Sequence, residues 1–377
     1  MATTHVYIVD SITFKYHLEY MFAGTGAKDN VIDFNNSSSC SLHYTQENNL
    51  VGMISDSLRA RKDDFVIFYL QQNSSERIRE GMFYGVFKVV EQSFLDNNNT
   101  KQYLKFSLQK SLTFRTLIEP YQVYSKGVTE WEALDEIKNI SSPNQMLWSL
   151  IYRKLKGNRG NTMITIYESE RLLKLIRDKN GQQSLNGNNF SFNKITQEIE
   201  TSKTINQYKG RKEKINILPR LIEKYSTNKQ FEIHLQAYIV QNIEVLSFIK
   251  DEKIEWIANE VSCGVGMQRI DIMLSVENKN RKLIPIELKS TYADIGITNQ
   301  LQRYIDWIRQ YYISNRPSDI EPMIISREIE NKRSQTYSDL ITSFRRFSKE
   351  NNILQLRYIE FSINQNKKDI KFTEIKY

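Results

Sequence analysis

Two apolar segments in the second half of the chain carry charged residues at positions that the interior of a sheet rarely accepts. The segments are RIDIML, at 269–274, and KLIPIELKS, at 282–290, and their β-branched residues favour strands. Because side chains alternate along a strand, Asp271 should point away from its apolar neighbours, and Glu287 and Lys289 should share one face. We therefore expect two acids and a lysine on one polar face of two neighbouring strands.

This polar face is expected to bind a divalent metal ion. Two neighbouring carboxylates repel each other, and burying them is costly unless a cation lies with them. Mg²⁺ prefers oxygen ligands, typically one or two protein carboxylates with water, and Mn²⁺ is expected to substitute for it. Such a metal polarises a phosphate and lowers the pKa of bound water, and a nearby lysine stabilises the added negative charge. The predicted chemistry is hydrolysis of a phosphodiester.

The order of these residues resembles the PD-(D/E)XK nuclease superfamily, and the surrounding motifs resemble those of NucS-type endonucleases. Glu232 stands in a predicted first core helix, QFEIHLQAYI, and the string QLQRY follows the ELK strand at 300–304. The glycine turn departs from the family pattern, because in GVGMQRID two residues are inserted before Arg269. The resemblance covers about residues 230–310 and implies an α/β fold in which helices flank a mixed central sheet.

The same resemblance implies roles for individual residues. Asp271 and Glu287 would bind the metal, and Lys289 would be catalytic. Glu232 would reach the metal through water, and Gln300 would support the site. A degenerate nuclease fold kept for binding is the alternative, and the intact set of two acids and a lysine argues against it. Further candidates in this segment are Arg269 and Arg303 for nucleic-acid contacts and Glu260 for the cleft.

The first half of the chain has the composition of a β-rich domain. Aromatic and β-branched runs at 63–71, 81–94 and 103–112 predict strands, and a short helical pattern lies at 143–155. Together they predict a small curled β-barrel with a few helices. The strings DDFVIFY and GMFYGVFKVV resemble the PUA-like superfamily, in particular its EVE and YTH domains.

That resemblance implies a domain that reads a modified base. Such domains hold a flipped base between aromatic side chains, whose stacking offsets the cost of extruding the base. Core packing is the competing interpretation for each aromatic residue of this half, and Trp131 is the strongest candidate because its neighbours in VTEWEAL are polar. The candidates for the modified-base pocket are Trp131, Tyr84, Tyr124 and Trp148, and those for phosphate contacts in the basic loop are Lys156 and Arg159.

A polar, basic segment separates the two halves. Residues 176–229 are predicted to be a linker, and the part from 203 to 229 holds eight bases and two acids. It therefore carries most of the formal net charge of +8 of the chain. A solvated linker and a contact to a nucleic-acid backbone, with Lys212 as a candidate, are both open interpretations of this charge.

Length and composition limit the classes of protein to consider. The 377 residues exceed one ordinary domain, and we expect a reader domain at 1–175, the linker, and a nuclease domain at 230–377. Two cysteines and four histidines cannot form a disulfide framework and make a Cys/His zinc site implausible. No apolar run reaches 18 residues and no signal peptide is evident, so a cytoplasmic protein without a membrane segment is expected.

Taken together, the two halves resemble a modification-dependent restriction endonuclease. The N-terminal domain would recognise a modified base in double-stranded DNA, and the C-terminal domain would hydrolyse a nearby phosphodiester with Mg²⁺. Cutting both strands needs two active sites, so a homodimer on DNA is expected. Two alternatives remain open: a NucS-like repair enzyme that recognises mismatched, flapped or branched DNA, and a non-catalytic protein that binds modified nucleic acid.

Overall fold

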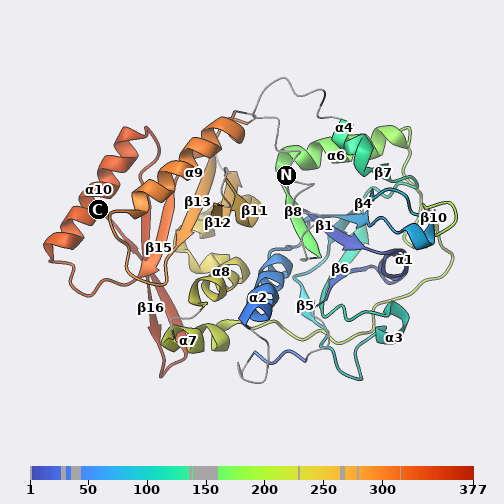
Figure 1. Cartoon of the computed structure of the whole chain (residues 1–377), viewed down its shortest axis with the longest axis horizontal. Helices are drawn as coiled ribbons and strands as arrows, with labels where there is room; N and C mark the ends of the chain where they lie inside the picture. Colours follow the sequence, from blue (N-terminus) through green and yellow to red (C-terminus); the bar gives the residue numbers. More distant parts are fainter. Residues whose placement is uncertain are drawn as a thin grey trace. The chain divides into compact units, whose positions relative to one another are not determined.

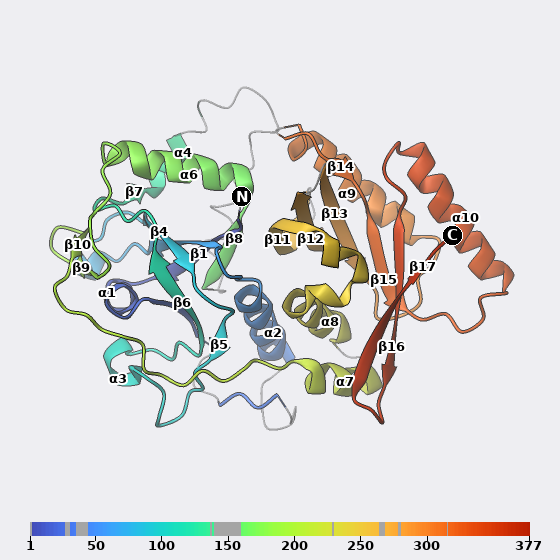
Figure 2. The same cartoon turned by 180° about the vertical axis from the view of Figure 1, so that it is seen from behind.

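The computed structural model describes most of the chain as two separate units. The described residues are 2–26, 31–34, 44–135, 138, 160–227, 230–263, 268–277, 280–314 and 316–377. Unit 1 consists of Met1–Asp33 and Ser38–Ile215, and unit 2 of Phe34–Ser37 and Asn216–Tyr377. Figure 1 and Figure 2 draw the chain from two opposite sides. No helix within the described ranges is long and apolar enough to cross a membrane.

Unit 1 is built on a mixed sheet, whose strands follow the spatial order β2-β6-β4-β3-β1-β8. The short strands β5 and β7 pair with β6 and β4, and β9 and β10 form a separate hairpin. The strands are β1 (Thr4–Val9), β2 (Phe22–Thr25), β3 (Phe65–Leu70), β4 (Met82–Val89), β5 (Phe94–Leu95), β6 (Phe114–Pro120), β7 (Val128–Thr129), β8 (Asn161–Ile164), β9 (Phe190–Asn193) and β10 (Glu198–Thr201). The helices are α1 (Ser11–Tyr20), α2 (Tyr44–Leu58), α3 (Lys105–Leu108), α4 (Glu130–Asp135) and α6 (Ile166–Lys179), with a 3₁₀ turn η1 (Ser74–Glu76).

The apolar run at 65–70 forms the central strand of this sheet, as its composition indicates. β3 pairs with β1 in parallel and with β4 in antiparallel orientation, and its residues from Val66 onward are buried. Helix α1 begins at a capping box, in which Asp10 accepts the Thr13 N–H at 2.7 Å and the Thr13 hydroxyl accepts the Asp10 N–H. The predicted mixture of strands with a few helices is confirmed. Within the described residues no pairing joins β2 to β8, so this part of the sheet is open.

The sequence pattern misled the prediction at two places in unit 1. The alternating segment 103–112 was expected to be a strand, but it contains the short helix α3, and the strand β6 begins only at Phe114. Residues 176–215, expected to be part of a linker, belong to unit 1. Phe190 and Phe192 of β9 are buried there against Phe14 of α1. These few apolar residues are enough to bury the hairpin, although Asn and Gly dominate the surrounding sequence.

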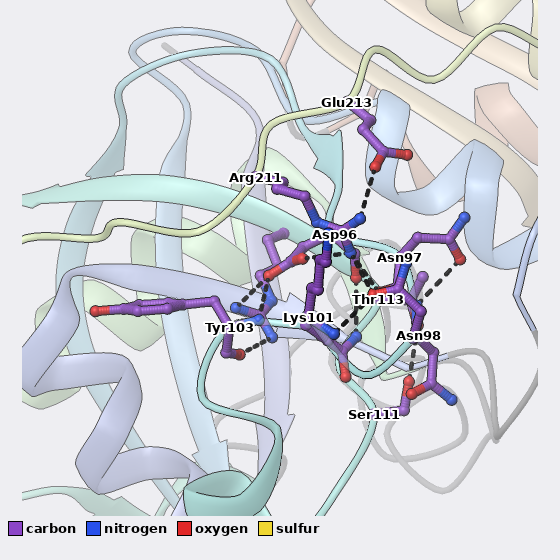
Figure 3. Close-up of polar contacts among 12 residues, drawn as sticks. Asp96, Asn97, Asn98, Lys101, Tyr103, Ser111, Thr113, Arg211 and Glu213 are labelled. Carbon is purple, nitrogen blue, oxygen red and sulfur yellow. Dashed lines mark hydrogen bonds and ion pairs between the residues drawn. The ribbon is translucent and has the colours of Figure 1, made fainter.

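The chain that leaves β10 is fastened to unit 1 by a buried polar cluster around Asp96, which we call the Asp96 cluster (Figure 3). Arg115 is fully buried and forms an ion pair with Asp96, with 3.0 Å between Nη1 and Oδ2. The Tyr208 hydroxyl donates to the same oxygen at 3.0 Å. Arg211 donates to the Asn97 carbonyl at 3.0 Å and lies 3.5 Å from Asp96 Oδ1. The carboxylate is thereby matched by two guanidinium groups.

Unit 2 contains a mixed sheet with the order β11-β12-β13-β15-β16-β17, and β14 pairs with β13. β13, β15 and β16 are parallel, and the outer strands are antiparallel to their neighbours. The strands are β11 (Lys253–Ser262), β12 (Arg269–Glu277), β13 (Arg281–Leu288), β14 (Asp319–Ile320), β15 (Met323–Arg327), β16 (Arg357–Asn364) and β17 (Asp369–Ile375). The helices are α7 (Leu218–Thr227), α8 (Phe231–Gln241), α9 (Ile297–Tyr311) and α10 (Gln335–Glu350), with 3₁₀ turns η4 (Ile243–Val245) and η5 (Ser247–Asp251).

Helices cover both faces of the unit 2 sheet (Figure 1). On one face, α7 and α8 bury a large apolar cluster that contains Ile272 of β12 and Ile284, Ile286 and Leu288 of β13. On the other face lie α9 and α10, whose Tyr304 and Phe344 contact the sheet. The alternation predicted for KLIPIELKS is confirmed, because its isoleucines and Leu288 pack under a helix.

Candidate active site

The site lies where β12 and β13 part. Their antiparallel ladder ends at the pair Ile272 and Ile286. One residue beyond it, the Asp271 carboxylate accepts the Leu288 N–H at 2.8 Å and closes the end of the ladder. On its other edge, β13 continues beside β15, and the Lys289 N–H donates to the Ile325 carbonyl at 2.9 Å. The backbone that carries the acids is therefore held from both sides.

Glu287 and Lys289 form the centre of a hydrogen-bonded chain on the α9 face. The Lys289 ammonium donates to Glu287 Oε1 at 2.7 Å and to Gln300 Oε1 at 3.2 Å. The Tyr304 hydroxyl lies 2.7 Å from Glu287 Oε2, and the Gln300 amide donates to that hydroxyl at 2.8 Å. Glu287 is buried, so these donors replace the water that its carboxylate loses. The structure thus brings together the predicted Glu287, Lys289 and Gln300.

Glu232 approaches the same strand end from the other face of the sheet. It is exposed in the first turn of α8. Its Oε1 accepts the Ser290 N–H at 2.8 Å and the Ser290 hydroxyl at 3.1 Å. Ser290 follows Lys289 directly, so Glu232 lies at the end of β13 but is turned onto the backbone next to the lysine.

The electrostatics of the site are dominated by its excess of carboxylates. Burial, and next the charge of Glu287, raise the pKa of Asp271 well above its usual range, and Glu232 acts in the same direction. Burial acts to lower the pKa of Lys289, but attraction to Glu287 and the other two acids outweighs it and raises that pKa. The one ammonium faces three carboxylates, so the site favours a further cation.

The donor set fits a metal that takes few protein ligands. Among the residues described, no group of three or more His, Cys, Asp or Glu has the arrangement of a metal cage. Asp271 and Glu287 offer carboxylate oxygens only, and Glu232 is engaged with Ser290. Two carboxylates with water are the ligands that Mg²⁺ typically accepts, whereas a site for zinc would need imidazole or thiolate groups.

The other predicted residues of this segment lie at the rim. Arg269, at the start of β12, is 3.3 Å from Glu260 of β11. Arg303 is exposed on α9. The thiol of Cys263 is buried, and burial followed by the charge of Glu287 raises its pKa to about 11, which keeps it protonated near neutral pH. Tyr304 is the residue that the sequence reasoning missed, although it stands one turn after Gln300 in QLQRY.

Two of the candidates for the base pocket, Tyr84 and Tyr124, lie in different apolar clusters of unit 1. Tyr84 is buried against Phe14 and Phe192, and its hydroxyl donates to the Gln197 carbonyl at 2.6 Å. Trp131, on α4, is 59% exposed. Trp148, Lys156 and Arg159 lie outside the described residues.

Lys212, the basic candidate of the connecting segment, has partners within unit 1. Its ammonium donates to Glu91 at 2.6 Å and lies 5.6 Å from the centre of the Phe94 ring. Arg211, its neighbour, is engaged in the Asp96 cluster. Two of the eight bases in this segment, Arg211 and Lys212, are therefore used to fasten it to unit 1.

Comparisons with known proteins place one clear likeness in unit 2. A search of curated proteins found no match. One solved structure with partial likeness is the human THYN1 protein in complex with DNA containing 5-methylcytosine, with 9% sequence identity and a TM-score of 0.28; the match covers 46% of this chain and 97% of that chain. Another is a hypothetical protein from Leishmania major, with 10% identity and a TM-score of 0.28; this match covers 48% of this chain and 97% of that chain. The DUF55 domain of human thymocyte nuclear protein 1 has 12% identity and a TM-score of 0.27, and the match covers 46% of this chain and 97% of that chain. Residues 231–358 match the family described as the endonuclease NucS C-terminal domain, which confirms the predicted likeness of the segment that carries Asp271, Glu287 and Lys289.

Proposed function

We propose that the chain is a metal-dependent DNA endonuclease, in which unit 2 hydrolyses a phosphodiester and unit 1 recognises a modified base. The observation that carries the proposal is the meeting of Asp271, Glu287 and Lys289 at one strand end, inside the segment that matches a nuclease domain. An α/β fold of the PD-(D/E)XK type for unit 2 and a PUA-like fold for unit 1 belong to the same proposal.

Asp271 and Glu287 would hold Mg²⁺ or Mn²⁺, and Glu232 would act through water. A bound Mg²⁺ would polarise the scissile phosphate and lower the pKa of an attacking water. The support for this comes from the two carboxylates themselves, because the raised pKa of Asp271 reflects burial beside another negative charge. A cation between the two acids removes that repulsion.

The side chains around the acids have distinct tasks in this proposal. Tyr304 holds one oxygen of Glu287, which leaves the other oxygen to Lys289 or to a cation. Gln300 holds the Lys289 ammonium by a separate hydrogen bond. Lys289 can therefore turn from Glu287 toward a phosphate without losing its second partner, and its positive charge would stabilise the transition state.

The test is a digestion panel of DNAs with different base modifications, incubated with Mg²⁺, Mn²⁺ or EDTA. Cleavage should need the metal and should disappear when Asp271, Glu287 or Lys289 is replaced by Ala. Glu277→Gln is a matched control, because Glu277 is a partly exposed acid at the other end of β12. Cleavage retained in all three alanine variants would overturn the assignment of the active site.

The reading of a modified base is tested at Trp131. Its ring is 59% exposed, which leaves it free to stack on a base. Trp131→Ala should weaken binding to modified duplex by about 1–3 kcal/mol and leave binding to unmodified duplex unchanged. Phe106→Ala is the matched control, because Phe106 is another exposed aromatic residue of unit 1. If wild type and Trp131→Ala bind modified duplex with equal affinity, Trp131 does not contact the modified base.

A structure-specific repair endonuclease is the second candidate, and the match to a NucS domain favours it. Mismatched, flapped and branched duplexes without modified bases distinguish the two functions. If these are cut as well as modified plasmid, the restriction function is excluded. A protein that binds modified nucleic acid without cutting it would show binding but no metal-dependent cleavage. For a restriction enzyme, sedimentation in the presence of DNA should reveal a homodimer, because cutting both strands requires two sites.

A further inference from the structure

Arg327 lies beside the segment that carries the proposed catalytic lysine. It is the last residue of β15, and its N–H donates to the Thr291 carbonyl at 3.1 Å. Two residues earlier, Ile325 pairs with Leu288 and accepts the Lys289 N–H. The backbone of Arg327 is therefore adjacent to the chain that runs from Lys289 to Thr291.

The guanidinium of Arg327 lies over two aromatic rings. It lies 4.7 Å from the centre of the Tyr225 ring of α7 and 5.8 Å from that of Tyr292, in the loop that follows β13. Because side chains alternate, Arg327 shares the α7 and α8 face with Ile325. Glu232 reaches the strand end from the same face. Ring faces fix the plane of a guanidinium but leave the N–H groups at its edge unused.

Arg327 has no acid to balance its charge in the described part of the chain. Other arginines of unit 2 do: Arg316 lies 2.7 Å from Glu255, and Arg357 lies 2.8 Å from Glu321. No carboxylate or carbonyl oxygen accepts a hydrogen bond from the guanidinium of Arg327 among the described residues. A half-buried cation that is positioned in advance and lacks an anion is suited to bind one.

The carboxylate site needs such a cation for a polyanionic substrate. Three acids lie at the end of β13, and the ammonium of Lys289 is already paired with Glu287. A DNA strand that enters this site brings further negative charge. Tyr292 is 47% exposed, so its ring also offers a surface for a sugar or a base beside the guanidinium.

We propose that Arg327, whose guanidinium lies over the rings of Tyr225 and Tyr292, binds a phosphate of the DNA strand that enters the carboxylate site. The inference rests on the proposed nuclease function, since it names a contact to the substrate of that site. Arg327 would position the strand and take no part in the chemical step. Its loss should therefore weaken binding more than it slows turnover of bound DNA.

The test measures binding of a labelled duplex to the full chain in EDTA over a series of salt concentrations. Each phosphate contact contributes about 0.9 to the slope of log K against log salt. Arg327→Gln should lower that slope by about 0.9 and weaken binding about tenfold at low salt. Arg327→Lys keeps the charge and should retain the slope. Arg345→Gln is the matched control, because Arg345 of α10 is exposed and its guanidinium lies over the ring of Tyr377.

The outcomes separate this inference from the proposed function. If Arg327→Gln and Arg345→Gln change slope and affinity equally, the phosphate site is overturned, whether or not the protein cleaves DNA. If Arg327→Gln alone lowers the slope but no DNA is cut with any metal, the phosphate site stands and the nuclease function fails. Should Arg327→Gln not fold, Tyr292→Leu replaces it, since loss of one ring should weaken binding a few-fold at an unchanged slope.

A second measurement locates the contact on the DNA. A single neutral methylphosphonate is moved along the strand near the cut, and binding of wild type and Arg327→Gln is compared at each position. At the contacted position the methylphosphonate should lower the DNA affinity of wild type about tenfold and that of Arg327→Gln almost not at all. The reason is that the methylphosphonate and the glutamine remove the same ion pair. Equal losses in both proteins at every position would contradict the proposal.

Discussion

Each unit holds an aspartate within a polar cluster, but the two clusters balance its charge in different ways. In unit 1, Asp96 is fully buried and is met by Arg115, Arg211 and the hydroxyl of Tyr208. In unit 2, Asp271 is half-buried, accepts one backbone N–H and faces the buried acid Glu287. In the first cluster two guanidinium groups face one carboxylate, whereas in the second the ammonium of Lys289 faces three carboxylates.

This difference separates a cluster that serves structure from one that is suited to a ligand. Charges that only stabilise a fold are paired, because an unpaired buried charge costs several kcal/mol. An unbalanced pair of acids is retained where something outside the chain completes it, as a metal does. The comparison therefore predicts that removing one charged group will lower the stability of unit 1 but not that of unit 2.

The largest effect is expected for Asp271→Asn. The amide oxygen can still accept the Leu288 N–H, but one of the two proposed metal ligands loses its charge. If the proposed function holds, DNA cleavage should fall by about 10³-fold. Because the raised pKa of Asp271 reflects burial beside Glu287, removing its charge should not lower the melting temperature in EDTA. Cleavage assays and thermal melts check the two parts. A variant that melts several degrees lower would mean that the acid is structural, like Asp96.

The counterpart in unit 1 is Arg115→Met. It leaves the Asp96 carboxylate buried with one guanidinium fewer and removes donors to the carbonyls of Leu112 and Tyr103. We expect a loss of about 3–5 kcal/mol in the free energy of unfolding, measured by chemical denaturation. Arg211→Met should cost less, because Arg211 is partly exposed and farther from the aspartate. Equal losses of unfolding free energy for the two variants would contradict the prediction that Arg115 stabilises Asp96 more than Arg211 does.

Next in size is a pH effect in the same unit. Burial, and next the charge of Arg115, lower the pKa of His17 to about 3 from the ordinary value of 6.5. The folded protein therefore binds this proton more weakly than the unfolded chain, and stability falls as the pH drops from 6.5 toward 3. The slope should approach about 1.4 kcal/mol per pH unit for one proton. The side chain packs against Phe22 and Phe68.

His17→Phe preserves an aromatic ring and should remove that part of the acid sensitivity. His5, whose pKa is also lowered by burial, should contribute to the dependence that remains. Unfolding measured at pH 7, 5 and 4 for wild type and variant gives the difference directly. If both proteins lose stability in parallel, His17 is not the group that titrates.

Unit 2 was easier to predict than unit 1 for a physical reason. Around Asp271 and Glu287 the two-residue alternation of a strand fixes which side chains share a face, and neither residue needs a distant contact to be placed. Tyr304 was missed because its role depends on the packing of α9 onto the sheet. Local periodicity does not contain that information.

In unit 1 the decisive contacts join residues far apart in sequence. Tyr84 shows the regular pattern of a strand, but only the hairpin of β9 and β10 reveals that its ring and hydroxyl are enclosed. Asp96 and Arg211 are separated by more than a hundred residues, so no pattern along the chain predicts their ion pair. Residues 176–229 were predicted to be a linker because the composition of this segment does not reveal its partners in unit 1.

The smallest effect is expected for the exposed ion pair between Lys212 and Glu91, whose side chains are 42% and 43% exposed. Lys212→Gln should lower the free energy of unfolding by less than about 1 kcal/mol, and added salt should shrink the difference further. Its ammonium is occupied by Glu91 and the Phe94 ring, so the salt dependence of DNA binding should stay the same. Titrations of wild type, Lys212→Gln and Arg327→Gln check this together. A slope that falls for Lys212→Gln would show that DNA displaces Glu91 and that a paired surface lysine can still contact phosphate.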